Sequence, residues 1–561
     1  MYYEELQAAK DQLTGPGGAF EIIETEIFGN RIRDFKNRPN SIREIWLATA
    51  QYADRPYLIY EQDRISYGEA HRQASSVAGW LFEQGVKPGD RIAIAMRNYP
   101  EWLLIYWGCV SAGITVVGMN AWWTEPEMAY GINDAKPKFI FADDDRLARL
   151  IDNPEIEAQS VLIGVRMENA RPGVIDYAEI ISQDRALPEV EVDPDSDACI
   201  FYTSGTTGFP KGAQLTHRGC VANLLNMQYA AASATLAAQT ATGVAPPDPL
   251  PVPVALITTP LFHVTANNCA AYRATAVGGA IVLMYRWDAG EALKLIERER
   301  ITSAGGVPVM GRELINHPDF DKTDTSSLLA ISCGGAQVPP DQVQKIDDQV
   351  QNARPGTGYG MTETCGIITS VAGDFFIDRP DSAGPAMPNF EAKCVNDAGE
   401  EVPLGELGEL WVRGSSVIKG YINRPEATAE SITDGWLHTG DIARMDADGF
   451  IYLVDRKKDM VLRGGENIYC VEVEAAMYHH PAIAECCVFG VPDERLGEEV
   501  GAAIYLKPGM SATADEVRAF CVDRLAKFKI PTHIWISETP FPRNASGKFL
   551  KREVRASLID A

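Results

Sequence analysis

A loop rich in glycine, serine and threonine is the most chemically suggestive segment of the chain. It runs from Phe201 to Gly212 as FYTSGTTGFPKG and follows an expected strand, Ala198–Tyr202. Glycines let the backbone approach a ligand closely, and N–H groups, hydroxyls and a lysine can bind phosphate oxygens. The loop is not a Walker A motif, because Pro210 precedes Lys211 and Gly212 follows it. Composition alone would make it an ordinary turn, but the twelve-residue pattern is more specific and indicates phosphate binding.

Four further segments follow in order. They are GYGMTE at 358–363, GWLHTGD at 435–441, DRKKD at 455–459 with GGEN at 464–467, and PRNASGK at 542–548. Together with TSGTTGFPKG they resemble the motifs of the adenylate-forming superfamily, which includes acyl-CoA synthetases, firefly-type luciferases and peptide-synthetase adenylation domains. The resemblance spans almost the whole chain and is closest to fatty-acid or aryl acid–CoA ligases. It implies a ligase that uses ATP, Mg²⁺ and coenzyme A to form acyl-AMP and pyrophosphate, then acyl-CoA and AMP.

The same resemblance assigns roles in nucleotide binding. It places Mg²⁺ on Glu363, adenine against Tyr359, and the ribose hydroxyls on Asp441 with help from Arg456. Each has a plainer interpretation: a surface carboxylate for Glu363, a core aromatic for Tyr359 and a turn residue for Asp441. The predicted nucleotide-binding set is Thr203, Ser204, Gly205, Thr206, Thr207, Gly208, Lys211, Gly334, Gly335, Ala336, Gly358, Tyr359, Gly360, Met361, Thr362, Glu363, Asp441 and Arg456.

Four residues are predicted to be catalytic: Lys548, Glu363, Thr203 and His263. The family's catalytic lysine, here Lys548, bridges the carboxylate and the α-phosphate in the first half-reaction. His263 resembles the aromatic gate between the ATP and acid pockets, although a buried structural histidine is almost as common an explanation. A lone lysine is usually solvated, so only its NASGK setting singles out Lys548.

The second half-reaction is expected to need a turn of the small domain about a hinge. By resemblance the hinge residue is Lys458, and the loop 463–467 lines the pantetheine channel. The two glycines of this loop let a thiol-bearing arm pass close to the backbone. The predicted CoA-binding residues are Arg463, Gly464, Gly465, Glu466 and Lys529, of which Lys529 is equally well explained as solvated.

The acid pocket is expected, by resemblance, to be lined by Val264–Ala271, Ala304–Pro308 and Cys333–Val338. None of these segments carries a charge, and a charged substrate tail buried there would lack a partner. We therefore expect an apolar acid, either a medium- or long-chain fatty acid or an aryl-alkanoic acid. The predicted pocket residues are His263, Ala266, Asn267, Gly305, Gly306, Val307 and Gly334.

Three alternative functions compete with this one. A stand-alone adenylation enzyme that loads an amino acid onto a carrier protein would need an acidic pocket residue, and Val264–Ala271 has none. A luciferase-like oxygenase shares the first step, so motifs hardly separate it from a CoA ligase. A membrane or scaffold protein could be built on the uncharged segment 102–124, which is long enough to span a bilayer.

The elements that position these residues belong to an α/β fold. Helical periods such as Ser66–Gln84 alternate with short strands such as Arg91–Ala95 and Lys138–Ala142, which predicts a mostly parallel sheet covered by helices. Segment 102–124 fits the same pattern as a buried helix, a turn at Ala112-Gly113 and a short strand. We expect a large N-terminal domain, residues 1–455, with a β-rich subdomain near its end. A small mobile α+β domain, residues 456–561, should carry Lys548.

Composition excludes several classes of partner. Lys and Arg number 51 and Asp and Glu 77, so the net charge is −26, and such a surface repels nucleic acid. The 11 cysteines show no metal-ligand or disulfide spacing, and the N-terminal segment MYYEELQAAKDQL lacks the apolar stretch of a secretory signal. We expect a cytoplasmic enzyme without stable membrane insertion. The sequence does not determine the oligomeric state, and a homodimer is compatible with it.

Overall fold

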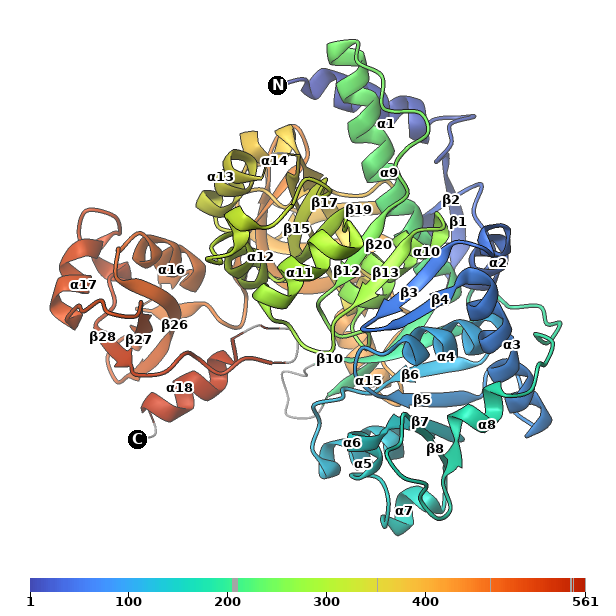
Figure 1. Ribbon diagram of the computed structural model, residues 1–561. Coiled ribbons are helices and arrows are strands. Elements are labelled where there is room, and N and C mark those ends of the chain that lie inside the picture. The colour runs from blue at the N-terminus through green and yellow to red at the C-terminus, as the bar shows by residue number, and fades with distance from the viewer. Residues whose placement is uncertain (204–209, 351, 465, 545–546, 548, 560–561) are drawn as a thin grey trace. The chain divides into compact units, whose positions relative to one another are not determined.

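Figure 1 shows the computed structural model, which describes residues 1–203, 210–350, 352–464, 466–544, 547 and 549–559. The chain divides into two compact units. Unit one contains Met1–Glu391 and Val412–Leu437, and unit two contains Ala392–Trp411 and His438–Ala561. The mixed α/β fold, with a large N-terminal body and a smaller C-terminal part, is confirmed, whereas the exact domain boundary after Asp455 stays a prediction.

Unit one is built around two mostly parallel sheets. The seven-stranded sheet has the order β11 (Lys211–Thr216), β10 (Asp197–Thr203), β6 (Thr115–Gly118), β5 (Arg91–Ala95), β7 (Phe139–Asp143), β8 (Val161–Val165), β9 (Ile175–Asp176). The eight-stranded sheet has the order β17 (Gly366–Ala372), β16 (Arg354–Met361), β15 (Ala330–Gly334), β14 (Ser303–Gly306), β12 (Val254–Ile257), β13 (Ala280–Leu283), β3 (Pro56–Tyr60), β4 (Asp63–Ser66). Among the strand pairs of these two sheets in the described residues, β10–β11, β16–β17 and β3–β4 are antiparallel, and each of them lies at the edge of its sheet.

Helices cover both sheets because their apolar faces must be buried against a strand layer. Residues of α11, α12 and α13 pack on the eight-stranded sheet in one apolar cluster, and residues of α5, α6 and α7 do the same on the seven-stranded sheet. The helices of this unit are α1 (Tyr3–Thr14), α2 (Ile42–Ala48), α3 (Tyr67–Glu83), α4 (Pro100–Ser111), α5 (Glu125–Ala135), α6 (Asp144–Leu147), α7 (Pro154–Glu157), α8 (Tyr177–Ile181), α9 (His217–Thr242), α10 (Tyr272–Ala276), α11 (Ala289–Glu299), α12 (Pro308–Ile315), α13 (Pro340–Gln349), α14 (Asp374–Asp378) and α15 (Pro425–Ser431).

The uncharged segment 102–124 forms the expected buried helix, turn and strand. Helix α4 begins at Pro100, whose fixed φ suits the first helical position, and ends at Ser111 before β6. It contacts β3 of one sheet and β5 and β6 of the other, which explains why it is apolar on every side. In the described part of the chain, no helix has both the length and the apolarity needed to cross a bilayer.

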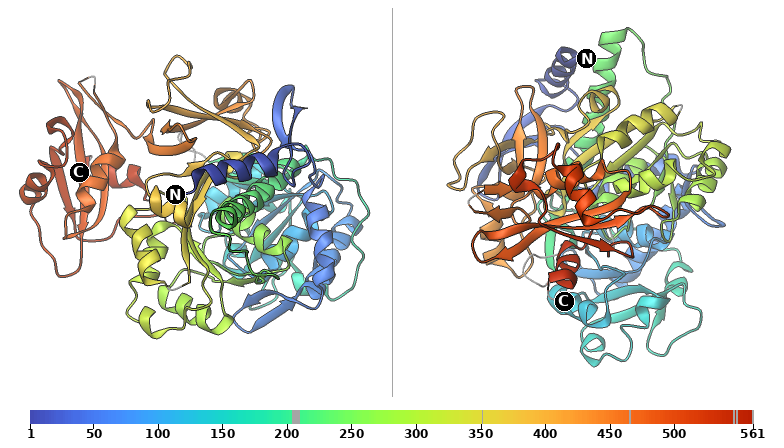
Figure 2. Two further views of the ribbon diagram at one scale, coloured as in Figure 1. Left: turned by 90° about the horizontal axis from the view of Figure 1, so that it is seen from above. Right: turned by 90° about the vertical axis from the view of Figure 1, so that its left-hand side faces the viewer.

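Other expected elements also form. The strand Arg91–Ala95 is β5, Lys138–Ala142 corresponds to β7, and Ser66–Gln84 corresponds to α3. Helix α9 ends at Thr242, and an exposed loop that includes Pro251 follows it. Helix α1 lies alongside α9 (Figures 1 and 2). A two-stranded hairpin of β1 (Ile22–Ile27) and β2 (Asn30–Phe35) was not predicted.

Most residues of two further sheets belong to unit two. In the first, β23 (Phe450–Arg456), β22 (Trp436–Met445), β20 (Gly408–Gly414) and β19 (Phe390–Val395) pair in that order, and the turn Asp446–Gly449 joins β22 to β23. The second has the order β25 (Glu466–Ile468), β24 (Val461–Arg463), β27 (Gly497–Leu506), β26 (Ile483–Asp493), and β28 (His533–Ser537) pairs with β27. Helices α16 (Cys470–Tyr478), α17 (Ala514–Cys521) and α18 (Lys551–Ile559) complete the unit.

Candidate functional site

The carboxyl edge of the eight-stranded sheet collects many of the residues predicted from the sequence. Strands β12, β14, β15 and β16 are parallel neighbours, so their carboxyl ends lie at one edge. Ligands of open α/β sheets bind at such an edge. Strand β14 ends at Gly306, β15 at Gly334 and β16 at Met361, while β12 leads through Thr258 to His263.

The predicted adenine slot lies on two of these strands. Gly334 of β15 pairs with Gly358 of β16, and Tyr359 follows with a half-buried side chain. A Cβ on Gly334 would lie 3.3 Å from the carbonyl oxygen of Gly358, so a side chain there would crowd the neighbouring strand. Gly335 and Ala336 are exposed directly after β15, and Gly335 has φ +79°, which favours glycine. This arrangement leaves backbone accessible beside an aromatic ring.

The phosphate loop connects two antiparallel strands. Thr203, the last residue of β10, pairs with Lys211, the first residue of β11, and the Thr203 hydroxyl lies 3.4 Å from the carbonyl oxygen of Lys211. The hydroxyl of Tyr130 donates to the carbonyl oxygen of Pro210 at 3.0 Å. The predicted ligands Ser204, Gly205, Thr206, Thr207 and Gly208 lie outside the described residues. The structure therefore places the two stems of the loop.

Glu363 is a buried carboxylate on a single 3₁₀ turn, Thr362–Thr364, between β16 and β17. The hydroxyl of Tyr421 donates a hydrogen bond to its Oε1 at 2.8 Å. The ammonium of Lys211 lies 5.1 Å from the centre of the Tyr421 ring. Burial, reinforced by the negative charge of Glu363, raises the pKa of Tyr421 well above its usual value, so the phenol keeps its proton and remains a donor.

Tyr421 is the site residue that sequence reasoning missed. It stands 58 residues after Glu363, in the segment Ile418–Ile422, and no periodic pattern distinguishes it from a core aromatic. The sequence carries no signal that would have found it, because the contact with Glu363 depends on pairing of this segment with β11.

His263 precedes an unusual helix. Residues Thr265–Ala271 form a π-helix, a form that occurs frequently at functional sites. The backbone N–H of Thr265 donates to Nδ1 of His263 at 3.2 Å, and the hydroxyl of Thr265 lies 3.1 Å from the same nitrogen. Ala266 and Asn267 are fully buried, and the side chains of this helix that reach solvent include those of Thr265 and Cys269.

The glycines predicted to leave room in the acid pocket have distinct surroundings. A Cβ on Gly305 would lie 1.8 Å from the carbonyl oxygen of Ser332 in β15, so this glycine is required by close strand pairing. A Cβ on Gly306, which has φ +145°, would approach Met310 and Thr258. Val307 is buried. The lining roles of these residues stay predictions.

The remaining predicted residues lie in unit two. Asp441 of β22 pairs with Arg456 of β23 in the sheet register, and their side chains form an ion pair of 3.3 Å. Asp441 is buried, so Arg456 compensates its charge and orients it. Lys458 lies in the turn that follows β23.

Two residues predicted to bind CoA are engaged by carboxylates in this structure. Arg463 makes two hydrogen bonds of 2.9 Å to Glu499, and Lys529 contacts Glu472 at 2.7 Å. Glu466 is exposed, and Gly464 has φ +61°. Gly465 and Lys548 lie outside the described residues.

Comparison with known protein families decides what kind of protein this is. Residues 45–422 match the family described as AMP-binding enzyme, and residues 472–548 match the C-terminal domain of AMP-binding enzymes. The chain is an AMP-binding enzyme.

Relatives of this AMP-binding enzyme are CoA ligases. It is 36% identical over 498 residues to a feruloyl-CoA synthase from Amycolatopsis sp, covering 88% of this chain and 93% of the relative. It is 30% identical over 534 residues to a long-chain-fatty-acid–CoA ligase from Bacillus subtilis, covering 90% and 92%. The solved structure of o-succinylbenzoate CoA synthetase from Bacillus subtilis, in complex with ATP and a magnesium ion, matches with a TM-score of 0.74 and 29% identity, covering 91% and 99%. The chain thus belongs to the acyl-CoA ligase family, as the sequence motifs predicted.

The described side chains of this AMP-binding enzyme fit one way of holding Mg²⁺. Among them, no group of three or more His, Cys, Asp or Glu is placed to enclose a metal ion. Mg²⁺ is commonly bound through one or two carboxylates together with substrate phosphates. Glu363, a single buried carboxylate held in a fixed orientation, suits that mode.

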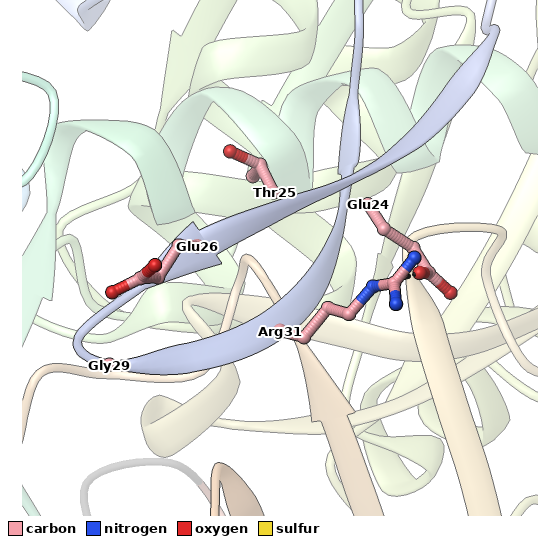
Figure 3. A pocket seen from close by; sticks show the side chains of 5 residues that line it. All are labelled: Glu24, Thr25, Glu26, Gly29 and Arg31. Carbon is pink, nitrogen blue, oxygen red and sulfur yellow. Dashed lines mark ion pairs between the residues drawn. The ribbon is translucent and has the colours of Figure 1, made fainter.

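A surface pocket elsewhere in unit one lacks these features. It lies on the β1–β2 hairpin and is lined by Glu24, Thr25, Glu26, Gly29 and Arg31 (Figure 3). Arg31 forms an ion pair with Glu24, and both side chains are largely solvated. All five residues belong to the hairpin, and none belongs to a predicted site.

Proposed function

We propose that this AMP-binding enzyme is an ATP-dependent acid–CoA ligase for an apolar carboxylic acid, either a medium- or long-chain fatty acid or an aryl-alkanoic acid. It forms acyl-AMP and pyrophosphate, and then acyl-CoA and AMP. The observation that carries the proposal is the carboxyl edge of the eight-stranded sheet. There, adjacent strands end in or next to residues to which the sequence motifs assign adenine, metal and acid binding.

The first half-reaction brings two anions together, because a carboxylate attacks the α-phosphorus of ATP. The enzyme must neutralise and align both partners. Lys211 and the N–H groups of its loop bind the phosphates, Tyr359 packs on adenine, and Glu363 holds the metal. Mg²⁺, when bound, withdraws charge from the phosphate oxygens. Lys548 is proposed to bridge the two reacting groups.

The second half-reaction transfers the acyl group to a thiol. The attacking sulfur replaces AMP at the acyl carbon, and the 463–467 loop is proposed to guide the pantetheine arm. Thr203, the last residue of β10, and His263, two residues before the π-helix, are proposed to border the reacting centre. The small domain is proposed to turn about Lys458. This turn would remove the residues of the first step from the reacting centre and bring in those of the second.

The nature of the acid is inferred from charge. The segments 264–271, 304–308 and 333–338 contain no Asp, Glu, Lys or Arg, so a charged tail would be left without a counter-ion. The relatives named above act by name on an aryl acid and on a long-chain fatty acid, and neither acid carries a charge beyond the carboxylate. The proposal therefore covers these two chemical classes.

An acid panel tests this function. Purified enzyme with ATP, Mg²⁺ and CoA is offered dodecanoate, hexadecanoate, ferulate, 3-phenylpropanoate, glutamate and succinate, and the thioesters are read by mass spectrometry. We expect thioesters from the apolar acids and not from the amino acid or the dicarboxylate. The reverse pattern would contradict the pocket assignment. Acyl-AMP without any thioester would instead favour transfer to a carrier protein.

A further inference from the structure

We infer that Tyr421 is a positioning residue of the adenylation site, which fixes the Glu363 carboxylate and the Lys211 ammonium for binding of Mg²⁺ and ATP. The inference rests on the proposed function, since the roles of Glu363 and Lys211 belong to it. No motif used to assign the site includes Tyr421.

The first argument is the cost of burying Glu363. Only 7% of this residue is exposed, and an ionised carboxylate at that depth needs donors. The Tyr421 hydroxyl supplies one at 2.8 Å, and the backbone N–H of Ile418 donates to the carbonyl oxygen of Glu363 at 3.0 Å. The segment 418–421 therefore holds both the side chain and the backbone of Glu363.

The second argument is that Tyr421 is itself firmly held. Its backbone N–H donates to the hydroxyl of Thr428 at 2.9 Å, and it forms a bridge with Ala213 of β11. On either side, the N–H of Gln214 donates to Gly420 and the N–H of Ile422 donates to Gly212, both at 2.9 Å. The segment thus pairs with the strand that leaves the phosphate loop. A displacement of either element would move the hydroxyl away from Glu363.

The third argument is the position of Lys211. Its ammonium lies over the face of the Tyr421 ring, where the ring quadrupole attracts a cation. The same tyrosine therefore contacts two groups of opposite charge, one proposed to bind phosphate and one proposed to bind the metal. A carboxylate accepts several hydrogen bonds, so the bond from Tyr421 still leaves acceptor capacity for a metal.

Tyr421→Phe tests this inference because it removes only the hydroxyl. ATP binding is measured by calorimetry on the full chain with and without Mg²⁺, in the absence of acid. For the variant, we expect the gain in ATP affinity on adding Mg²⁺ to fall about tenfold, the lower end of the range found for groups that orient metal ligands. The metal-free ATP affinity should change less than about twofold, because the ring that faces Lys211 is retained.

Tyr57→Phe is the matched control. Tyr57 is also buried in unit one. Its hydroxyl accepts from Nε1 of Trp107 at 2.8 Å and lies 3.0 Å from the hydroxyl of Thr275, and neither partner is a residue assigned to the site. It should leave the Mg²⁺-dependent gain unchanged even if it lowers the melting temperature. An equal loss in both variants would mean that the Tyr421 effect is a general consequence of weakened packing, and the inference would be wrong.

A double-mutant cycle with Glu363→Gln gives a second measurement. If Tyr421 acts through Glu363, then Tyr421→Phe should add little to the loss of Mg²⁺-dependent affinity already caused by Glu363→Gln. Additive losses would overturn the inference. Failure of the roles that the proposed function gives to Glu363 and Lys211 has a different result, because the wild-type enzyme would then show no Mg²⁺-dependent gain in ATP affinity. If the wild type gains ATP affinity on adding Mg²⁺ and Tyr421→Phe shows the same gain, then the positioning role of Tyr421 is wrong and the proposed function stands.

Discussion

Asp455 is a buried carboxyl at the end of β23, and its titration should be visible in the stability of the enzyme. Burial raises its pKa from 3.8 to about 6, although Lys551 and the N–H of Arg456 act in the opposite direction. The unfolded chain loses this proton near pH 4 and the folded chain retains it up to about pH 6. The native state therefore loses stability as pH rises between these values, by about 3 kcal/mol in total.

Asp455→Asn should remove that dependence. The apparent melting temperature of wild type and variant is measured from pH 4 to pH 7, and the difference should shift in favour of the variant as pH rises. The variant need not be more stable overall, because Asp455 accepts from the N–H groups of Arg456 and Cys470 and an amide replaces only one acceptor. Parallel curves would show that Asp455 does not titrate in this window.

Single residues were predictable where a motif carries them. Glu363 and Lys211 stand in contiguous strings, and the structure places Glu363 in a buried turn and Lys211 at the start of β11. Tyr421 was not predictable, because its contact with Glu363 arises from pairing of segment 418–422 with β11, a long-range event. Asp441 and Arg456 were predicted to act together, and strand register explains their ion pair.

At the scale of elements, close pairing of β14 and β15 leaves no room for a side chain at Gly305. Its missing Cβ would lie 1.8 Å from the carbonyl oxygen of Ser332, an atom that cannot move without displacing the strand. Gly305→Ala should therefore lower stability by about 2 kcal/mol or more. Gly334→Ala is the comparison, because its Cβ would lie 3.3 Å from its nearest neighbour. Thermal unfolding should rank wild type, Gly334→Ala and Gly305→Ala in that order.

Whole elements were easier to predict than their fine geometry. Segment 102–124 was identified as helix, turn and strand because a buried element lacks charge and a turn needs glycine. The π-helix at 265–271 was not predicted, since a side-chain pattern does not encode which carbonyl each N–H reaches. The β1–β2 hairpin was missed because it lacks the alternation of a half-buried strand.

At the scale of the whole molecule, the net charge constrains how the enzyme binds its anionic substrates. The net charge of −26 makes binding of both ATP and CoA depend on local cations, and Lys211, Arg456 and Arg463 are the cations that the sequence analysis predicts for this role. All eleven cysteines lie among the described residues and none of them forms a disulfide. Ten are buried, so their thiols behave as small apolar groups.

The two half-reactions should separate by mutation if the C-terminal part of the chain turns between them. Lys458→Pro fixes φ at the proposed hinge and also restricts Lys457, whose N–H donates to Gly440 at 2.9 Å. Adenylate formation, followed by acid-dependent ATP–pyrophosphate exchange, should be largely retained. Thioester formation from synthetic acyl-adenylate and CoA should fall by about tenfold or more. Lys458→Ala is the control, because it removes the side chain and leaves the backbone free to turn.

Lys548→Ala should give the opposite pattern. Loss of one preorganised charge at the reacting phosphate typically costs on the order of 10²–10³ in rate, so exchange should nearly vanish. Thioester formation from supplied adenylate should continue near the wild-type rate, because that step is proposed to occur after Lys548 has left the site. Equal loss of both steps in Lys458→Pro, or the same loss in Lys458→Ala, would argue against a hinge at this residue. A Lys548→Ala enzyme that exchanges pyrophosphate normally would show that another group bridges the carboxylate and the α-phosphate.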